Sequence, residues 1–327
     1  MSTLQVTPPR IRKRSGRLYP EFGAGTVEYV IVILVAIVIG SGLLAFGNQV
    51  SGQVTKTGDS ISSWFSKANG TGGTGGGNAG DGNSGTDGRI EELKEKDPAD
   101  WTLDDQKAVA EDIAAKGEDS AVYAKAEAAM DAGTKWSIKL TNGKTLEYRI
   151  IGIYHDDHAD SSGSTGLTFE VTNDALGAQR MCSVDNYFNS WEESELRARL
   201  NTGDLWALLP SELQSKVETV TKETNAKDSD EVDYPSEATD KVFLLSMTEI
   251  YGDLDSGEYP EGYQYEYFQS KGVTMSSYSG ASSSHGHWTR SARRGNTSYF
   301  YYVSSNGSYG SDGNVGFPAC VFPAWCF

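Results

Sequence analysis

The feature that most constrains the fold is an uncharged apolar run near the N-terminus. From Tyr29 to Phe46 the chain reads YVIVILVAIVIGSGLLAF, 18 residues without a charged side chain. An α-helix needs about 20 such residues to cross the hydrocarbon core of a bilayer. We therefore expect a single membrane-spanning helix within residues 24–66. A cleaved secretory signal is disfavoured, because its apolar core is shorter and a small-x-small site follows it.

Charge on the two sides of this run sets the expected orientation. Residues 1–23 carry a net charge of +4, which comes from Arg10, Arg12, Lys13, Arg14 and Arg17 against Glu21. Basic flanks stay cytoplasmic, so the rest of the chain is expected outside the cell. The whole chain has a net charge of −17, so the residues after 23 carry −17 − 4 = −21. We do not expect nucleic-acid binding, because it needs clustered Lys and Arg, and the acidic remainder of the chain lacks such clusters.

Glu28 stands at the edge of the apolar run, where a carboxylate is costly unless it has a partner. The segment GAGTVEYVIVILVAI, with Gly23 followed by four residues and then Glu28 and Tyr29, resembles the processing site of Flp-type prepilins of the tight-adherence pilus family. The resemblance implies that a prepilin peptidase cleaves between Gly23 and Ala24 and removes a basic leader, residues 1–23. It also implies that Glu28 pairs with the new N-terminal amine of a neighbouring pilin-like subunit. A signal anchor with an edge glutamate is the alternative.

The next segments separate this helix from the remainder of the chain. Residues 68–88, ANGTGGTGGGNAGDGNSGTDG, offer nothing to bury, which predicts a flexible linker at 67–88 that spans on the order of 25 Å. Residues 89–133 are rich in Ala, Glu, Lys and Asp, and Gly117 and Gly133 stand where helix C-caps are favoured. Thr102 and Asp105 resemble a capping box. We expect a helical hairpin here, packed on the main domain or serving as a stalk.

After Gly133 the sequence changes to short β-rich runs, WSIKL, LEYRIIGIYH, LTFEV, KVFLLS and SYFYYV. Asn142-Gly143 between the first two predicts a hairpin turn. Helical patterns cover 190–201 and 206–223. Strands, helices and strands in this order predict an α+β domain over 134–327.

Several landmarks in this region resemble a family of bacterial domains of unassigned function, related to the C-type-lectin-like fold of formylglycine-generating-type proteins and hypervariable ligand binders. They are GIYHDD at 152–157, GLTFEV at 166–171, SWEESELRARLN at 190–201, LLP at 208–210, KVFLLSMTEIYG at 241–252, HWTRSARRG at 287–295 and VGFPACVF at 315–322. The resemblance implies a compact fold in which Trp191, Trp288 and Arg290 are structural, and in which the last loops form an adaptable binding face. The closing motif departs from the family at Phe317, where an arginine is usual.

The tail RRGNTSYFYYVSSNGSYGSDGNVG is dominated by Tyr, Ser, Asn, Gly and Asp, the composition of recognition loops. We predict that the ligand-binding residues are Asn296, Ser298, Tyr299, Tyr301, Ser304, Asn306, Ser308, Tyr309, Ser311, Asp312 and Asn314. A polar loop around a buried Tyr-rich strand is the alternative. Because randomised adenines in AAY codons reach these residue types, the tail also resembles the variable region of proteins that a retroelement diversifies.

No sequence pattern predicts a cofactor, a metal site or catalysis. His155, Asp156, Asp157, His158 and Asp160 have metal-ligand side chains but are expected to form turns or a solvated surface. No nucleophile elbow, P-loop or dinucleotide fingerprint is present.

Cysteine usage is sparse. If the domain is exported, Cys182, Cys320 and Cys326 favour one disulfide and one free thiol, and the sequence does not say which two cysteines pair. Three buried thiols without a disulfide are the alternative. The pattern of formylglycine-generating enzymes, which rely on a reactive cysteine pair, is not matched.

The sequence therefore predicts a single-pass membrane protein whose C-terminal domain is extracellular and can be incorporated in a pilus. Flp pilins are very short, so the large domain points to a minor or tip subunit. We expect it to be an adhesin that binds an extracellular protein or glycan. A structural pilus subunit or assembly initiator without a ligand, and an exported enzyme of the formylglycine-generating type, are the alternatives.

Overall fold

The computed structural model describes residues 84–183, 190–227, 233–252, 260–293 and 298–327. The chain divides into two compact units, Met1–Ala79 and Gly80–Phe327, and all described residues belong to the second. The predicted leader at 1–23 and pilin-like helix at 24–66, with Gly23, Ala24, Glu28 and Tyr29, lie outside the described residues. Within the described ranges, none of the helices has the length and apolar composition needed to cross a bilayer.

Three helices open the described part of the chain. They are α2 (Ser84–Glu95), α3 (Leu103–Lys116) and α4 (Tyr123–Ala132), with short 3-10 turns at Pro98–Asp100 and Gly117–Asp119. The predicted hairpin over 89–133 thus has a third helix, and α2 begins five residues inside the predicted linker, at Ser84. Thr102 forms the predicted capping box: its hydroxyl accepts from Asp105 N at 3.2 Å, and Asp105 accepts from Thr102 N at 2.9 Å.

The first sheet has the strand order β1-β2-β3-β12-β7, and neighbouring strands run antiparallel. Its strands are β1 (Lys135–Lys139), β2 (Thr145–Ile153), β3 (Leu167–Val171), β7 (Val242–Phe243) and β12 (Ala324–Cys326). The predicted turn at Asn142-Gly143 joins β1 to β2, and Gly143 has the positive φ of +85° that favours glycine. Tyr148, Phe169 and Trp325 form an aromatic core, with ring centroids 5.1 to 5.9 Å apart.

The second sheet has the order β10-β9-β8-β11-β4. Its strands are β4 (Ala178–Gln179), β8 (His287–Ala292), β9 (Tyr299–Val303), β10 (Tyr309–Asn314) and β11 (Ala319–Cys320). A separate ribbon pairs β5 (Val220–Lys227) with β6 (Asp233–Asp240). The short helices are α5 (Glu195–Asn201), α6 (Ser211–Gln214), α7 (Met247–Tyr251) and α8 (Glu266–Ser270), with 3-10 turns at Trp206–Leu208 and Ser279–Ala281.

The predicted helix over 206–223 is wrong in its second half. A 3-10 turn and the four-residue α6 end by Gln214, and β5 begins at Val220. The β-branched residues Val220 and Thr221 face Asp240 and Thr239 across the β5–β6 ribbon. This pairing, together with Pro210 before α6, explains why a long helix does not form.

The expected disulfide is also absent. All three cysteines fall in the described residues, and none of them is disulfide-bonded. Cys326 is fully buried in β12, and its Sγ lies 3.4 Å from the Thr168 hydroxyl and 3.5 Å from an Asp156 carboxylate oxygen. The thiol is therefore part of a polar contact within the core.

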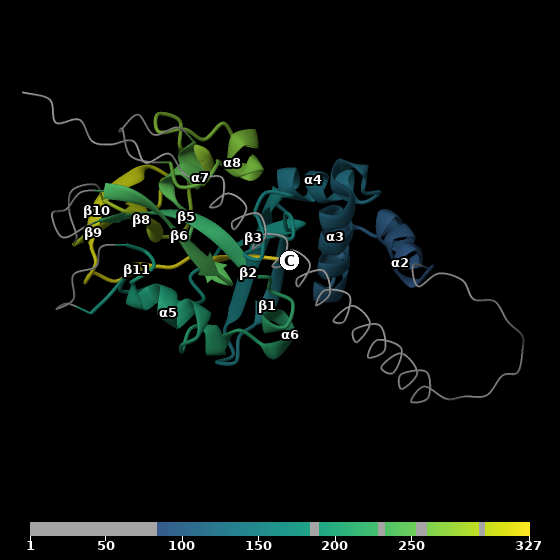
Figure 1. Cartoon of the computed structure of the whole chain (residues 1–327), viewed down its shortest axis with the longest axis horizontal. Helices are drawn as coiled ribbons and strands as arrows, with labels where there is room; N and C mark the ends of the chain where they lie inside the picture. The colour runs from purple at the N-terminus through teal and green to yellow at the C-terminus, as the bar shows by residue number, and fades with distance from the viewer. Residues whose placement is uncertain (1–83, 184–189, 228–232, 253–259, 294–297) are drawn as a thin grey trace, which may run out of the picture. The chain divides into compact units, whose positions relative to one another are not determined.

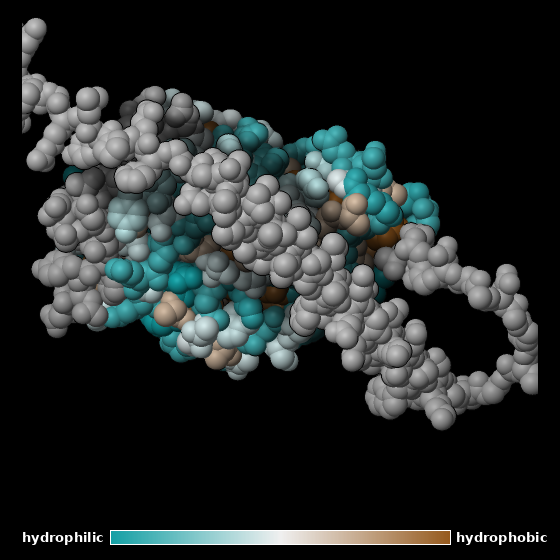
Figure 2. Space-filling view, in the orientation of Figure 1, coloured by the Kyte–Doolittle hydropathy of each residue, from teal (hydrophilic) through white to brown (hydrophobic). Residues whose placement is uncertain are grey.

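The prediction of an α+β domain is confirmed. Figure 1 shows α2, α3 and α4 at one end of the domain, next to the sheet that contains β2 and β3, and shows β8, β9 and β10 at the other end. In Figure 2 the described residues on this face are predominantly hydrophilic, with small scattered hydrophobic spots. This surface agrees with the acidic composition.

Candidate functional site

The predicted recognition segment forms an antiparallel hairpin at the edge of the second sheet. Tyr299 and Tyr301 lie in β9, and Tyr309, Ser311, Asp312 and Asn314 lie in β10, the edge strand. Ser304, Asn306 and Ser308 lie in the connecting turn, Ser298 directly precedes β9, and Asn296 lies outside the described residues. The hairpin therefore brings residues from both halves of the predicted set together. Tyr309 is 45% exposed, whereas Tyr299 and Tyr301 are half-buried.

The turn of this hairpin is fixed to the body of the domain. The Tyr251 hydroxyl donates to the Gly307 carbonyl at 2.6 Å, and Ser283 N donates to the Ser305 carbonyl at 3.0 Å. Gly307 has a φ of +86°, and a Cβ there would lie 2.2 Å from the Tyr278 carbonyl oxygen. A glycine is required at this close approach. The exposed residues of the turn are thus presented on a rigid support.

Two buried tryptophans lie below the surface of the domain. Trp288, in β8, stacks edge-on against Tyr302 of the hairpin, with ring centroids 6.4 Å apart, and its indole N–H donates to the Gln179 carbonyl at 2.9 Å. Trp191 is fully buried, and its indole N–H donates to Asp240 at 2.8 Å. The indole N–H of each is therefore satisfied, as is usual for a buried tryptophan.

Arg290 is fully buried in β8 and is held by a network of acceptors. Its guanidinium forms an ion pair with Glu249 and donates to the carbonyls of Leu244, Glu223 and Glu261 at 2.9 to 3.1 Å. Burial opposes its charge, but the carboxylate of Glu249 raises the pKa of Arg290 above its ordinary value. The arginine is therefore a charged tie between β8, α7 and the β5–β6 ribbon.

A second buried cation completes this charge network. Lys222 Nζ lies 2.5 Å from a Glu249 carboxylate oxygen and forms a shorter ion pair with Asp156. Burial opposes the charge of both groups, yet the pair raises the pKa of Lys222 and holds the pKa of Asp156 well below its ordinary value. A lysine held as an ammonium ion is not a nucleophile or a general base. The network favours a structural role over catalysis.

The thiols give no sign of nucleophilic chemistry either. Burial raises the pKa of Cys182 to about 11, and it also raises the pKa values of Cys320 and Cys326. A thiol, unlike a thiolate, is a poor nucleophile and metal ligand. Among the residues that the structure describes, no group of three or more His, Cys, Asp and Glu side chains is arranged to hold a metal ion. His155 instead contacts Glu266 at 3.0 Å.

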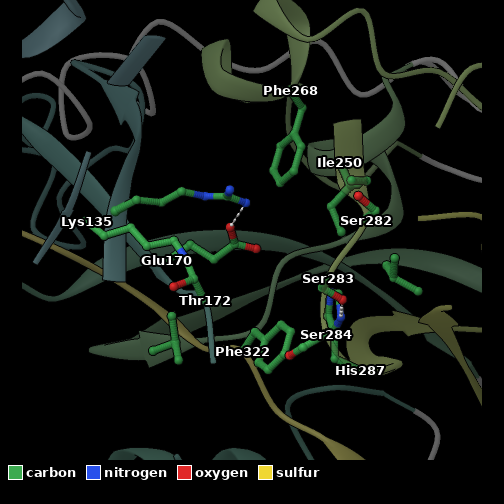
Figure 3. A pocket seen from close by; sticks show the side chains of 14 residues that line it. Lys135, Glu170, Thr172, Ile250, Phe268, Ser282, Ser283, Ser284, His287 and Phe322 are labelled. Atoms are coloured by element: carbon green, nitrogen blue, oxygen red, sulfur yellow. Dashed lines mark hydrogen bonds and ion pairs between the residues drawn. The ribbon is translucent and has the colours of Figure 1, made fainter. Parts of the chain in front are cut away.

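A cavity of about 260 Å³ lies beside the hairpin turn and is lined by residues of both five-stranded sheets. The first sheet contributes Arg149 and Glu170, and Thr172 directly follows β3. His287 of β8 and Phe322 also line the cavity. Figure 3 shows Phe268 at one end of the cavity and Phe322 with His287 at the other.

The cavity has an exposed mouth and a buried floor. Lys135, Ser282 and Ser284 are exposed at the mouth, whereas Glu170, His287 and Phe322 are buried. Ser282 and Ser284 flank Ser283, the residue that bonds to the hairpin turn. The mouth is therefore continuous with the predicted recognition turn.

The polar groups of the lining residues are only partly satisfied by the protein. Arg149 pairs with Glu170 at 2.9 Å and donates to the Tyr267 hydroxyl at 2.7 Å, but its Nε atom is buried without a hydrogen-bond partner. The Thr172 hydroxyl is likewise buried and unpartnered. Burial lowers the pKa of His287 to about 4, so this imidazole is neutral at pH 7.

The cavity has no signature in the sequence. Its lining is drawn from five or more separate segments between Lys135 and Phe322, and the residues carry no common local pattern. Several lining residues lie within sequence landmarks, but nothing in those motifs marks them as cavity residues; they are Glu170, Val171, Ile250, His287 and Phe322. The signal is the fold itself, which brings the ends of β3 and β8 together.

Comparison with known proteins bears on the C-terminal part of the chain only. No curated protein and no solved structure matches it. Residues 165–326 match the family model described as a domain of unknown function (DUF6273). This confirms the prediction of a domain of unassigned function in this region, and the match begins inside the predicted range of 134–327. The hairpin and most of the cavity lining fall within the matched residues, as do Lys222, Glu249 and Arg290 of the charge network, whereas Asp156 lies before them.

Proposed function

We propose that this chain is a surface-displayed, pilin-like adhesin whose C-terminal domain binds an extracellular ligand through the β9–β10 hairpin. The observation that carries the proposal is the rigid attachment of a Tyr-, Ser- and Asn-rich hairpin at the edge of a sheet, where Tyr309 is 45% exposed. Tyrosine supplies contact area at a low entropic cost, and the short polar residues supply adaptable hydrogen bonds. The lectin-like relation of the domain is part of this proposal.

The anchoring part of the proposal rests on the sequence alone. The spacing of Gly23 to Glu28 and the apolar run that follows favour processing by a prepilin peptidase and assembly with pilin-like subunits. The chain would then sit in the cell membrane as a single-pass protein, or in a pilus as a minor or tip subunit, with its acidic domain outside. A diversifying retroelement is supported only by composition, and a near-repeat template with a reverse-transcriptase gene beside the coding sequence is the test.

The binding proposal is tested with purified full-length chain on a printed array of glycans and extracellular proteins. Replacing Tyr299, Tyr301 and Tyr309 together by alanine is expected to lower the signal at bound spots at least tenfold, with little change in melting temperature. Tyr263→Ala is the matched control, because Tyr263 is 80% exposed and lies outside the hairpin. Retained binding in the triple variant refutes the proposal. A melting temperature lowered by about 8 °C or more, as a loss of core packing would give, also counts against it.

The structural alternative, a pilus subunit without a ligand, predicts no bound spot on any array and full incorporation of the triple variant into sheared pili. Array binding and incorporation into sheared pili, measured together on the triple variant, therefore distinguish an adhesin from a pilus subunit without a ligand.

A further inference from the structure

A row of charged side chains lies along one side of the cavity beside the hairpin turn. Lys135 of β1 stands directly opposite Arg149 of β2, and Arg149 stands directly opposite Glu170 of β3. Residues that face one another across neighbouring strands project their side chains from the same face of the sheet. All three residues line the cavity. The pairing of the strands therefore directs this row of charges at the cavity.

The three side chains differ in exposure, and this difference decides which charge a ligand meets. The Glu170 side chain is 5% exposed and pairs with Arg149, itself 16% exposed, at 2.9 Å. Lys135 is 48% exposed, and its partner Glu147 is 45% exposed, lies 3.5 Å away and does not line the cavity. Exposed ion pairs of this kind contribute little to stability, so a ligand can displace Glu147 from the Lys135 ammonium group.

The accessible charge of the cavity is therefore positive. Arg149 and Glu170 balance one another, and His287 is neutral at pH 7 because burial lowers its pKa to about 4. Lys135 remains. The chain as a whole carries −17, but at physiological ionic strength exposed charges that are more than about 8 Å away are largely screened. A single ammonium group favours a ligand with one negative charge, because a second charge would meet carboxylates without a cation of its own.

Hydroxyl groups stand on the other side of the cavity. Figure 3 shows Ser282 across the cavity from Lys135 and Glu170. Ser282 and Ser284 are exposed, and a serine hydroxyl can donate to a carboxylate oxygen or accept from a ligand hydroxyl. The volume of the cavity is about 260 Å³, whereas about 150 Å³ accommodates one benzene molecule. The cavity therefore has room for a six-membered ring that carries a carboxylate.

We propose that this cavity binds a small molecule that bears one carboxylate group, with the carboxylate at the Lys135 ammonium group and other polar atoms at Ser282 and Ser284. The inference deepens the proposed binding function, on which it rests, by naming the charge and the chemical class of the ligand. The observation that carries it is the accessible Lys135, at the exposed end of a row of side chains that strand pairing directs at the cavity.

The test is saturation-transfer NMR followed by titration, with the full-length chain at pH 7 and physiological salt. The probes are two matched pairs, glucuronic acid with glucose and galacturonic acid with galactose, because the members of each pair share a ring and differ by a carboxylate. Any detergent must be uncharged and lack a sugar headgroup. At least one acid is expected to bind about threefold or more tightly than its neutral partner, and about 1 M sodium chloride is expected to reduce this preference.

Lys135→Gln removes the charge but keeps a long polar side chain, and it is expected to weaken binding of the acid about threefold to tenfold while binding of the neutral sugar is unchanged. Lys139→Gln is the matched control, because Lys139 is also exposed in β1 but does not line the cavity. Both lysines are at the surface, so both variants are expected to fold. Ser282→Asp is a second variant, which should weaken binding of the acid by placing a like charge at the mouth.

The inference is overturned if no probe binds, if neither acid binds more tightly than its neutral partner, or if inorganic phosphate binds more tightly than both acids. Equal effects of Lys135→Gln and Lys139→Gln also overturn it. These outcomes are distinguishable from failure of the proposed function. A chain that shows no preference for the acids but loses array binding in the triple tyrosine variant overturns the cavity inference alone. Binding of an acid by a chain whose array binding is unaffected in the triple tyrosine variant overturns the role of the hairpin instead.

Discussion

Replacement of Lys222 by methionine would test whether the buried charge network holds the domain together. The Lys222 side chain is 4% exposed, and its partners Asp156 and Glu249 are 2% and 1% exposed. Without the lysine, Asp156 loses its ion-pair partner, whereas Glu249 keeps its pair with Arg290. Breaking a buried ion pair on one side costs about 3–5 kcal/mol, and we expect a loss of this size at pH 7.

The cost should depend on pH in a defined direction. In the native chain the pKa of Asp156 is held low, so the stability from its pairing is present above its ordinary value of 3.8 and is lost as pH falls below it. In the variant, burial without the lysine raises this pKa. Asp156 then takes up a proton as pH falls toward 4, and the difference between the two proteins shrinks.

Urea unfolding followed by tryptophan fluorescence at several pH values measures this difference. Lys94→Met is the control, because Lys94 is 37% exposed and its pair with Glu91 on α2 should be worth less than about 1 kcal/mol. Adding Asp156→Asn to Lys222→Met should recover part of the loss at pH 7. A loss below about 1 kcal/mol at pH 7, or one that does not change with pH, refutes the reasoning.

Three further predictions concern separate features of the chain. Burial raises the pKa of Glu261 from 4.5 to about 7, so the folded chain keeps a proton that the unfolded chain releases, and the stability of the native chain falls as pH rises across this window. Glu261→Gln removes this titration and should gain about 2–3 kcal/mol on the native chain between pH 5 and 8. If the unfolding free energies of the two proteins in urea change with pH in parallel, this prediction is contradicted. Gly307→Ala should lower the melting temperature more than Gly143→Ala. Both glycines have φ near +85°, but only a Cβ at position 307 would clash with backbone atoms. An equal loss of melting temperature in the two variants would mean that the turn can shift to accommodate the methyl group. Gly23→Ala should leave the basic leader on the chain, which mass spectrometry of membrane fractions would show. Glu28→Ala should still lose its leader but be missing from sheared pili. Normal processing of Gly23→Ala counts against the prepilin interpretation.

Local signals in the sequence predicted the structure where local physics decides it. The capping box at Thr102 and the turn at Asn142-Gly143 depend on bonds between residues three or fewer positions apart, and β3 was predicted within its bounds. The helix predicted at 206–223 failed because the partner of β5 begins at residue 233, which local propensity does not reveal.

The candidate site divides in the same way. Composition marked the hairpin, since its residues are contiguous in the sequence. The cavity needs Arg149, Thr172 and His287 in one place, although they are separated by up to 138 positions. Such a juxtaposition exists only once the chain is folded.

The position of β12 has a consequence for how the domain is made. This strand, Ala324–Cys326, lies between β3 and β7 in the first sheet. During synthesis, β3 and β7 emerge long before the strand that joins them, and Phe169 and Phe243 lack their central neighbour until then. A sheet that closes only on its latest strand folds slowly and by non-local contacts. In a chain exported as we propose, this order would delay closure of the first sheet until nearly all of the printed sequence has crossed the membrane, and it would keep the domain unfolded during translocation.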